Sequence, residues 1–413
     1  MKKIIASAVG LMLAGGIAAT AASAAVENQF GGYWRTRFTF EDNFDGKDSA
    51  SRNYVDTRTR LFYTAKFNDD FKFINKFEFN TGWGDLNGGD LGADGKGNWR
   101  IKNTYADFNM GPVNAKVGIQ GGVIARGFIL DDDFAGAVLT PKFGNISLPI
   151  IWARISDEDV QKFDTSTVPT FNQDLFAVLA AIKINDGMTV TPYAVYHSIT
   201  DHDDIGDATQ LADTDNFYVG VDADLKFGSV SVWGTGIFNG GDINDQDTTA
   251  FLAAAGADAG IVHGQAFYAT GDDDATDGDN DAFISAPGLG ANLTSAGTGS
   301  SYYWSEIMGL GVFDNAPSAG SPGDDITNIW AANAGVTIKP MDKLKIDADV
   351  WYAELAEDNA AGDSELGLEF DGKLTYTIMD NLTAEGIFAY LISGDATGDE
   401  DVMEGGVRLS LKF

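Results

Sequence analysis

Residues 365–378 read ELGLEFDGKLTYTI and alternate between apolar and polar side chains. One set of alternate positions is apolar: Leu366, Leu368, Phe370, Leu374, Tyr376 and Ile378. The other set is polar: Glu365, Glu369, Asp371, Lys373, Thr375 and Thr377. Successive side chains of a β-strand point to opposite faces of the sheet. The segment therefore predicts a strand with one apolar face and one polar face.

The same alternation recurs along the chain, for example at 71–80 and 217–227. Strands of soluble sheets are usually about five or six residues long, whereas these segments run to roughly 10 to 13 residues, which suits a tilted strand that crosses a bilayer. The mean hydropathy is unremarkable. Lipid-facing and water-facing residues on alternate positions cancel in such an average.

Short turns and longer acidic loops separate these segments in alternation. We expect tight turns at 68–70, 110–112, 143–145, 185–187, 227–229, 258–260, 340–342 and 379–381. We expect longer loops at 42–53, 83–98, 121–134, 157–172, 200–215, 240–247, 271–327, 357–364 and 394–401. A strand at Tyr302–Leu310 would break the alternation of directions, so that segment is placed inside the long 271–327 loop, folded toward the lumen.

These features predict an all-β fold, a transmembrane antiparallel up-and-down β-barrel. Eight turns and nine loops join eighteen strands. Sixteen strands remain the alternative, because 176–184 and 251–257 alternate poorly. Short turns on one side and long loops on the other are typical of bacterial outer-membrane barrels, which have an even strand count.

The first 24 residues predict a Sec signal peptide. Lys2 and Lys3 precede an apolar run at 4–17, and Ala22-Ser23-Ala24 supplies a cleavage site. The predicted organisation is thus a signal peptide at 1–24 and a barrel at 25–413, exported to the cell outer membrane.

Composition excludes several other classes of protein. The chain has no Cys, so it has no disulfide framework and no thiolate site. Its 61 acidic residues outnumber 27 basic ones, a net charge of -34 that argues against a nucleic-acid partner. Three His are present, and none has a spacing that selects a catalytic base, so we expect no enzyme.

The chain ends in an alternating strand with a terminal aromatic residue. Its apolar positions are Val407, Leu409, Leu411 and Phe413. Such an end resembles the signal by which the barrel assembly machinery recognises outer-membrane barrels.

The architecture as a whole resembles the porins of Gram-negative bacteria. More specifically, the stretches 32–38, 56–61, 113–121 and 127–136 are similar to the alginate-export-like porins. That resemblance implies eighteen strands and an arginine-lined lumen. Ile119 stands where that family usually has a basic residue.

Basic residues concentrate on the polar faces of the first strands, whereas later strands carry mainly acidic ones. We expect the pore and its selectivity to be set by Arg35, Arg37, Arg58, Arg60, Arg100, Lys102, Arg126, Asp131, Asp132, Asp133 and Arg154. The first four would form a ladder at a constriction, and Asp131–Asp133 would fold inward opposite them on the third loop. Rings of charged side chains set selectivity in pores. The arginines could equally serve to satisfy neighbouring carboxylates.

The sequence predicts a channel for passive diffusion of small hydrophilic or charged solutes, with no cofactor. The alternative is a structural, adhesin or receptor barrel without transport. Asp277, Asp279 and Asp281 form a weak candidate for Ca²⁺, although the EF-hand pattern fails. Expected partners are outer-membrane lipid, lipopolysaccharide, the assembly machinery and small solutes; a homotrimer and a monomer both remain open.

Overall fold

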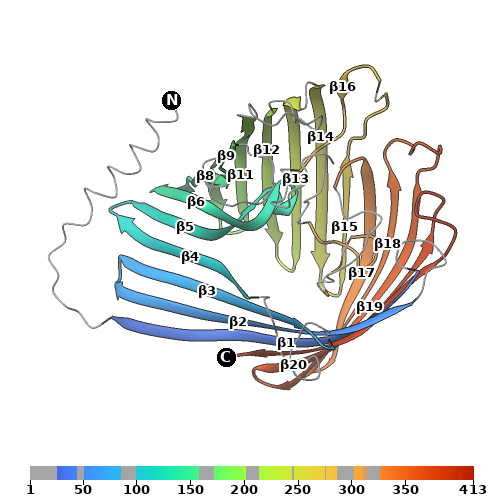
Figure 1. The fold of residues 1–413 in the computed structure, drawn as a ribbon, viewed down its shortest axis with the longest axis horizontal. Coiled ribbons are helices and arrows are strands. Elements are labelled where there is room, and N and C mark those ends of the chain that lie inside the picture. The colour runs from blue at the N-terminus through green and yellow to red at the C-terminus, as the bar shows by residue number, and fades with distance from the viewer. Residues whose placement is uncertain are drawn as a thin grey trace.

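The strands form one closed antiparallel barrel (Figure 1). The computed structural model describes residues 26–43, 51–84, 99–157, 172–200, 214–243, 246–274, 276–285, 302–309, 311, 313 and 326–413. Neighbours in sequence pair with one another, and the last strand pairs with the first, Arg37 lying opposite Arg408. This closure leaves the sheet without an unpaired edge, as a membrane-spanning sheet requires. The barrel has 18 strands, which confirms the predicted class and count.

Twenty-one labelled segments build this barrel. They are β1 (Glu27–Asp42), β2 (Arg52–Asn68), β3 (Phe71–Gly82), β4 (Trp99–Met110), β5 (Val113–Ile124), β6 (Leu130–Phe143), β7 (Ile146–Ser147), β8 (Ile150–Ser156), β9 (Asn172–Leu179), β10 (Ala181–Asn185), β11 (Met188–Thr200), β12 (Thr214–Phe227), β13 (Val230–Ile243), β14 (Gln246–Ala259), β15 (Val262–Ala269), β16 (Asp279–Asn280), β17 (Ile329–Met341), β18 (Leu344–Leu355), β19 (Glu365–Met379), β20 (Leu382–Ser393) and β21 (Val402–Lys412). A short 3-10 helix, η2 (Ala125–Gly127), joins β5 to β6.

Two crossings of the barrel are each made of two segments. β7 and β8 are separated at Pro149, whose ring nitrogen carries no hydrogen for the ladder. β9 and β10 are separated at Ala180. The break at Ala180 falls within 176–184, one of the two segments whose poor alternation left sixteen strands open; the other, 251–257, lies within the continuous strand β14. β16 is a two-residue pairing beside β14 and does not cross the barrel.

The connections alternate as the sequence predicted. Each expected tight turn joins two crossings at the end of the barrel that we name the short-turn end; the opposite end is the long-loop end. The predicted signal peptide at 1–24 lies outside the described residues, as do large parts of several long loops. In the part of the chain that the structure describes, no helix is long and apolar enough to cross a membrane.

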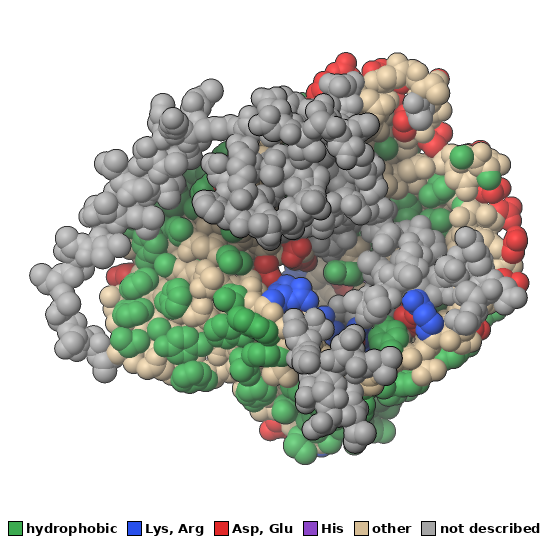
Figure 2. All heavy atoms as spheres, in the orientation of Figure 1, with side chains coloured by type: hydrophobic (Ala, Val, Ile, Leu, Met, Phe, Trp, Pro, Cys, Tyr) green, Lys and Arg blue, Asp and Glu red, His purple; other side chains and the backbone are tan. Residues whose placement is uncertain are grey.

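The outward side of the strands is apolar and exposed. On β12, Phe217, Val219 and Val221 are exposed, whereas the intervening Tyr218 is fully buried inside the barrel. Exposed aromatic residues lie near both ends of the barrel, such as Trp83 and Trp99 at one end. Figure 2 shows apolar side chains gathered over the flank formed by β3 and β4. An apolar band between aromatic girdles is the outer surface of a transmembrane barrel.

A β-bulge in β19 reverses part of the predicted alternation. Gly367 has a φ of 129°, and the register between β18 and β19 shifts beside it. A bulge adds one residue to one strand and turns the following side chains to the other face. Leu366 therefore lies in the interior at 2% exposure, and Glu365 is exposed opposite Glu354. The sequence had predicted the opposite, with Glu365 on the polar face and Leu366 on the apolar face.

Close packing of β6 against β8 gives the first testable expectation. A Cβ atom added at Gly136 would overlap the carbonyl oxygen of Trp152, whereas one added at Gly236 meets nothing within 4 Å. Overpacking of this kind costs about 1–3 kcal/mol. Gly136→Ala should lower the midpoint of heat-induced unfolding on unboiled gels by several degrees, and Gly236→Ala should leave it unchanged. Equal midpoints for both variants would contradict the packing described.

Candidate functional site

Two segments from the long-loop end fold into the lumen and meet there. The first follows β5 and contains Phe128 and Ile129, both fully buried. The second comprises the described residues 302–309, 311 and 313 of the connection between β15 and β17, and we name it the inward segment. The rings of Phe128 and Tyr302 stack with centroids 3.8 Å apart. The lumen is therefore narrowed by chain from two different connections.

The inward segment lies along the wall of the barrel rather than pairing as a strand. Burial raises the pKa of Tyr302 to about 12, so its hydroxyl stays protonated and donates to Gln265 Oε1 at 2.8 Å. The ring of Trp304 packs edge-on against Trp351 of β18, with centroids 5.1 Å apart. The expectation that 302–310 belongs to the long connection and not to the wall agrees with this course, although Leu310 itself lies outside the described residues.

A buried carboxylate on β19 fixes the middle of the inward segment. Glu369 has no exposed surface. Its two oxygens accept the backbone N–H groups of Ile307 and Met308 at 2.7 and 2.9 Å. A buried backbone N–H group left without an acceptor costs about 1–3 kcal/mol, so these two bonds favour the observed position of the segment. Glu369 thus holds the inward segment against β19.

Three arginines hold the other end of the inward segment. The carbonyl oxygen of Phe313 accepts hydrogen bonds from Arg35, Arg37 and Arg408 at 3.5, 3.0 and 3.2 Å. The guanidinium of Arg408 also lies 5.0 Å from the centre of the Phe313 ring. Cations over aromatic faces are attracted by the ring quadrupole. The inward segment thus bridges a carboxylate on β19 and guanidinium groups on β1 and β21.

We name as the arginine cluster the six guanidinium groups that lie together on β1, β2, β4 and β21. Its members are Arg35, Arg37, Arg58, Arg60, Arg100 and Arg408. Register explains their proximity, because Arg35 lies opposite Arg58 and Arg37 opposite Arg408. Figure 2 shows basic and acidic side chains together around the hollow of the barrel. The predicted ladder of four arginines therefore exists as a spatial group.

Carboxylates lie within the arginine cluster and compensate much of its charge. Glu78 is nearly fully buried and pairs with Arg60 at 2.6 Å and with Arg100 at 3.1 Å. Asp56 pairs with Arg37 at 2.7 Å. Buried charges are stable only when they are paired and hydrogen-bonded. The arrangement contains both features that the sequence predicted. The arginines form a group, and neighbouring carboxylates form ion pairs with them.

A cavity of about 770 Å³ lies on the long-loop side of this cluster. We name it the outer chamber. Its lining includes Arg35, Arg37, Arg52, Arg58 and Arg100, with Asp56 as its acidic member. A basic lining in a low-dielectric surround concentrates anions. The outer chamber is the place where the charge of the arginine cluster faces open space.

The predicted position of Asp131, Asp132 and Asp133 is wrong. These residues lie in the first part of β6, directly after Leu130, and pair with Val123, Gly122 and Gly121 of β5, so they belong to the wall and not to an inward loop. Asp133 pairs with Lys102 at 2.6 Å on the neighbouring part of the wall. Asp is depleted in strands, which is why the acidic run looked like a loop. The residues that fold inward from this connection are Phe128 and Ile129.

Two further predicted pore residues lie away from the arginine cluster. Arg126 lies in the η2 helix that precedes Phe128, and it pairs with Asp224 of β12 at 2.9 Å. Arg154 of β8 pairs with Asp174 at 2.8 Å and with Asp157 at 2.9 Å near the long-loop end. The sequence predicted these two side chains in the pore but outside the ladder of four arginines, and their positions agree with that separation.

The two described histidines and the described part of the acidic loop do not form a recognisable metal centre. His197 is buried against Gln173 at 2.8 Å, His263 lies 2.8 Å from Asp349, and His202 lies outside the described residues. Among the residues that the structure describes, no group of three or more His, Asp or Glu is arranged to hold a metal ion. Asp277 instead accepts the backbone N–H of Asp279. Calcium binding at 277–281 stays a weak prediction.

Four residues with important contacts were missed as site residues. They are Glu78, Glu369, Phe313 and Arg408. Arg408 could have been found, because barrel closure puts the last strand beside the first. Glu369 stood on the predicted polar face of 365–378, and Glu78 lies in the alternating segment 71–80, but neither was singled out. Phe313 carries no sequence signal, since the group that accepts hydrogen bonds from the arginines is its backbone carbonyl, which every residue has.

No family model and no curated protein matches the chain. Solved structures do match: Pseudomonas aeruginosa OccK8 (OprE) has a TM-score of 0.59 at 13% identity, covering 94% of this chain and 98% of that one. OpdQ of the same organism has a TM-score of 0.57 at 13% identity, covering 94% and 97%. OpdK, solved with vanillate, has a TM-score of 0.57 at 12% identity, covering 94% and 98%.

At these identities the likeness establishes the fold. The chain has the barrel fold of Gram-negative outer-membrane porins, which confirms the general resemblance to porins that the sequence indicated. The finer resemblance to alginate-export-like porins stays an expectation.

Proposed function

We propose that the protein is an outer-membrane channel through which small hydrophilic or charged solutes diffuse passively, with the arginine cluster as its selectivity element. The outer chamber carries this proposal, because a cavity of about 770 Å³ lined by five arginines opens inside the barrel. Eighteen strands are enough to leave a lumen that side chains alone do not fill. No energy source or resident cofactor enters the proposal.

The direction of the barrel in the membrane follows from its connections. Short turns of such barrels face the periplasm and long loops face outward. The outer chamber would then receive solutes from outside the cell, and the inward segment would set the narrowest passage behind it. In this orientation Val407, Leu409, Leu411 and Phe413 end near the periplasmic side, where we expect the assembly machinery to recognise them. Contacts with lipopolysaccharide belong to the same proposal, which is compatible with a homotrimer and with a monomer.

The apolar interior gives some support to the alternative of a barrel without transport. Inside the barrel, beneath Phe128 and the inward segment, Leu252, Phe267 and Trp351 are nearly fully buried. Apolar filling of this kind obstructs part of the lumen between β8 and β18. The passage that we propose therefore runs along the arginine cluster, on the other side of the barrel.

Liposome swelling tests whether the barrel conducts solutes. Proteoliposomes loaded with impermeant dextran should swell in isotonic arabinose or glycine, since both are small enough for the lumen, and should not swell in an isotonic oligosaccharide. Protein heated before reconstitution is the control. If folded protein gives no more swelling than heated protein, the barrel is a closed structural or receptor protein.

A further inference from the structure

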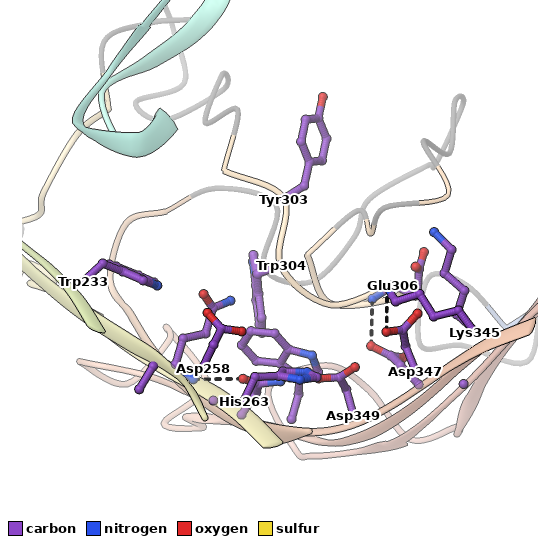
Figure 3. Close-up of a pocket in the computed structure, with 17 residues that line it drawn as sticks. Trp233, Asp258, His263, Tyr303, Trp304, Glu306, Lys345, Asp347 and Asp349 are labelled. Carbon is purple, nitrogen blue, oxygen red and sulfur yellow. Dashed lines mark hydrogen bonds and ion pairs between the residues drawn. The ribbon is translucent and has the colours of Figure 1, made fainter. Parts of the chain in front are cut away.

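A second cavity of about 410 Å³ lies in the lumen at the short-turn end, and we name it the inner chamber. Its wall is formed by β13–β15 and β17–β19. The inward segment covers it with Tyr303, Trp304 and Glu306. Figure 3 shows Asp258, His263, Asp347 and Asp349 around the chamber, with Trp304 reaching down between them. Unlike the outer chamber, it has no arginine among the described residues of its lining.

The lining carries an excess of carboxylates over cations. Five acidic side chains line the chamber: Asp258, Glu306, Asp347, Asp349 and Asp371. Its two lysines already have partners, because Lys345 lies 2.8 Å from Asp347 and Lys373 lies 3.2 Å from Glu385. A cavity lined by one sign of charge with low-dielectric walls focuses the field on an entering ion of the opposite sign.

Two carboxylates of the lining differ in their surroundings. Asp371 Oδ2 accepts the backbone N–H of Glu306 at 3.3 Å, and the Asp371 carboxyl group is also hydrogen-bonded to that of Glu369. Asp258 is exposed at the edge of the chamber, so an entering solute can reach it.

Aromatic rings form the remaining surface of the chamber. Trp233, Trp304 and Trp351 all line it. The guanidinium of Arg126 already lies 5.0 Å from the centre of the Trp233 ring. Tryptophan provides the most favourable aromatic face for cations. The chamber thus combines carboxylates with the kind of ring on which this protein already places a cation.

We propose that the inner chamber binds small organic cations that carry an ammonium or guanidinium group on a short apolar body. This inference rests on the proposed function, because the chamber is reached through the same lumen. The charged group of the solute would lie between Asp258 and Asp349, and its apolar body would contact the tryptophan rings. The two chambers then favour solutes of opposite charge on the two sides of the inward segment.

Isothermal titration calorimetry of the full barrel in non-ionic detergent tests this site at pH 7. The probes are 2-phenylethylammonium, its uncharged counterpart 2-phenylethanol and the anion phenylacetate. We expect the cation to bind at least about tenfold more tightly than either of the others, because only it gains from the carboxylates. If the alcohol binds equally well, the chamber is a simple apolar pocket and the proposal fails.

Variants locate the binding and exclude a general charge effect. The double variant Asp258→Asn with Asp349→Asn should weaken binding of 2-phenylethylammonium about tenfold, and Asp258→Asn alone, at an exposed position, should weaken it measurably. The matched control is Asp69→Asn with Asp186→Asn, since both carboxylates lie on short turns and are almost fully exposed. Unchanged affinity in the folded double variant would overturn the site.

The two proposals fail in distinguishable ways. Liposome swelling by the same variants reports on the channel and does not depend on cation binding. A barrel that swells liposomes but shows no preference for the cation lacks the inner site, whereas a barrel that binds the cation without swelling is not a channel.

Discussion

Replacing Glu369 by Ala should raise the single-channel conductance about twofold or more. The substitution removes the acceptor of the Ile307 and Met308 backbone N–H groups, both of which are buried. Each buried donor left without a partner costs about 1–3 kcal/mol. The inward segment then favours positions nearer to water, and the passage beside it widens.

Two companion variants separate release of the segment from damage to the barrel. Glu369→Gln keeps one acceptor oxygen and should give an intermediate conductance. Glu365→Gln alters an exposed carboxylate on the same strand, whose side chain the bulge at Gly367 turns away from the lumen, and should behave like the unmodified protein. If folded Glu369→Ala conducts like the unmodified protein, the segment does not limit the passage.

The barrel could be predicted from the sequence because its determinants are local. Each strand carries its own two faces, and each tight turn has its own turn residues, so the strand count and the alternation of short and long connections followed directly. The failures were also local in origin. Nothing in 365–378 distinguishes Gly367 as the position of a bulge, so Glu365 and Leu366 were placed on the wrong faces.

The candidate site could be predicted only in part. Arg35, Arg37, Arg58 and Arg60 share strand faces, and their grouping needed only the pairing of neighbouring strands. The inward segment has no periodic signal in the sequence, because hydrogen bonds to its backbone groups hold it in place. Its attachments at Glu369 and at the Phe313 carbonyl group therefore appeared only in three dimensions.

Replacing Arg35, Arg37, Arg58 and Arg60 together by Gln should shift ion selectivity toward cations. A unit charge 4 Å from an ion contributes about 1 kcal/mol even in bulk water, so the loss of four charges should change the ratio of anion to cation permeability about tenfold. Arg35 and Arg37 also hold the Phe313 carbonyl group, so the conductance should rise as well.

The control variant removes four positive charges away from the arginine cluster. Lys66, Lys183, Lys226 and Lys343 lie at or beside the short turns. Their replacement by Gln matches the change in net charge and should leave the selectivity nearly unchanged. Screening over about 10 Å at 0.1 M salt confines each charge to its own surroundings.

The reversal potential in planar bilayers under a KCl gradient tests the central claim most directly. It is recorded for the unmodified protein, for the variant with the four arginines replaced, and for the lysine control. We expect stable conductance steps from both proteins and a reversal potential that moves toward the cation equilibrium potential in the variant, but not in the lysine control. Conductance steps with the same reversal potential in all three proteins would contradict selectivity by the arginine cluster, and a lack of steps from the folded unmodified barrel would contradict the channel itself.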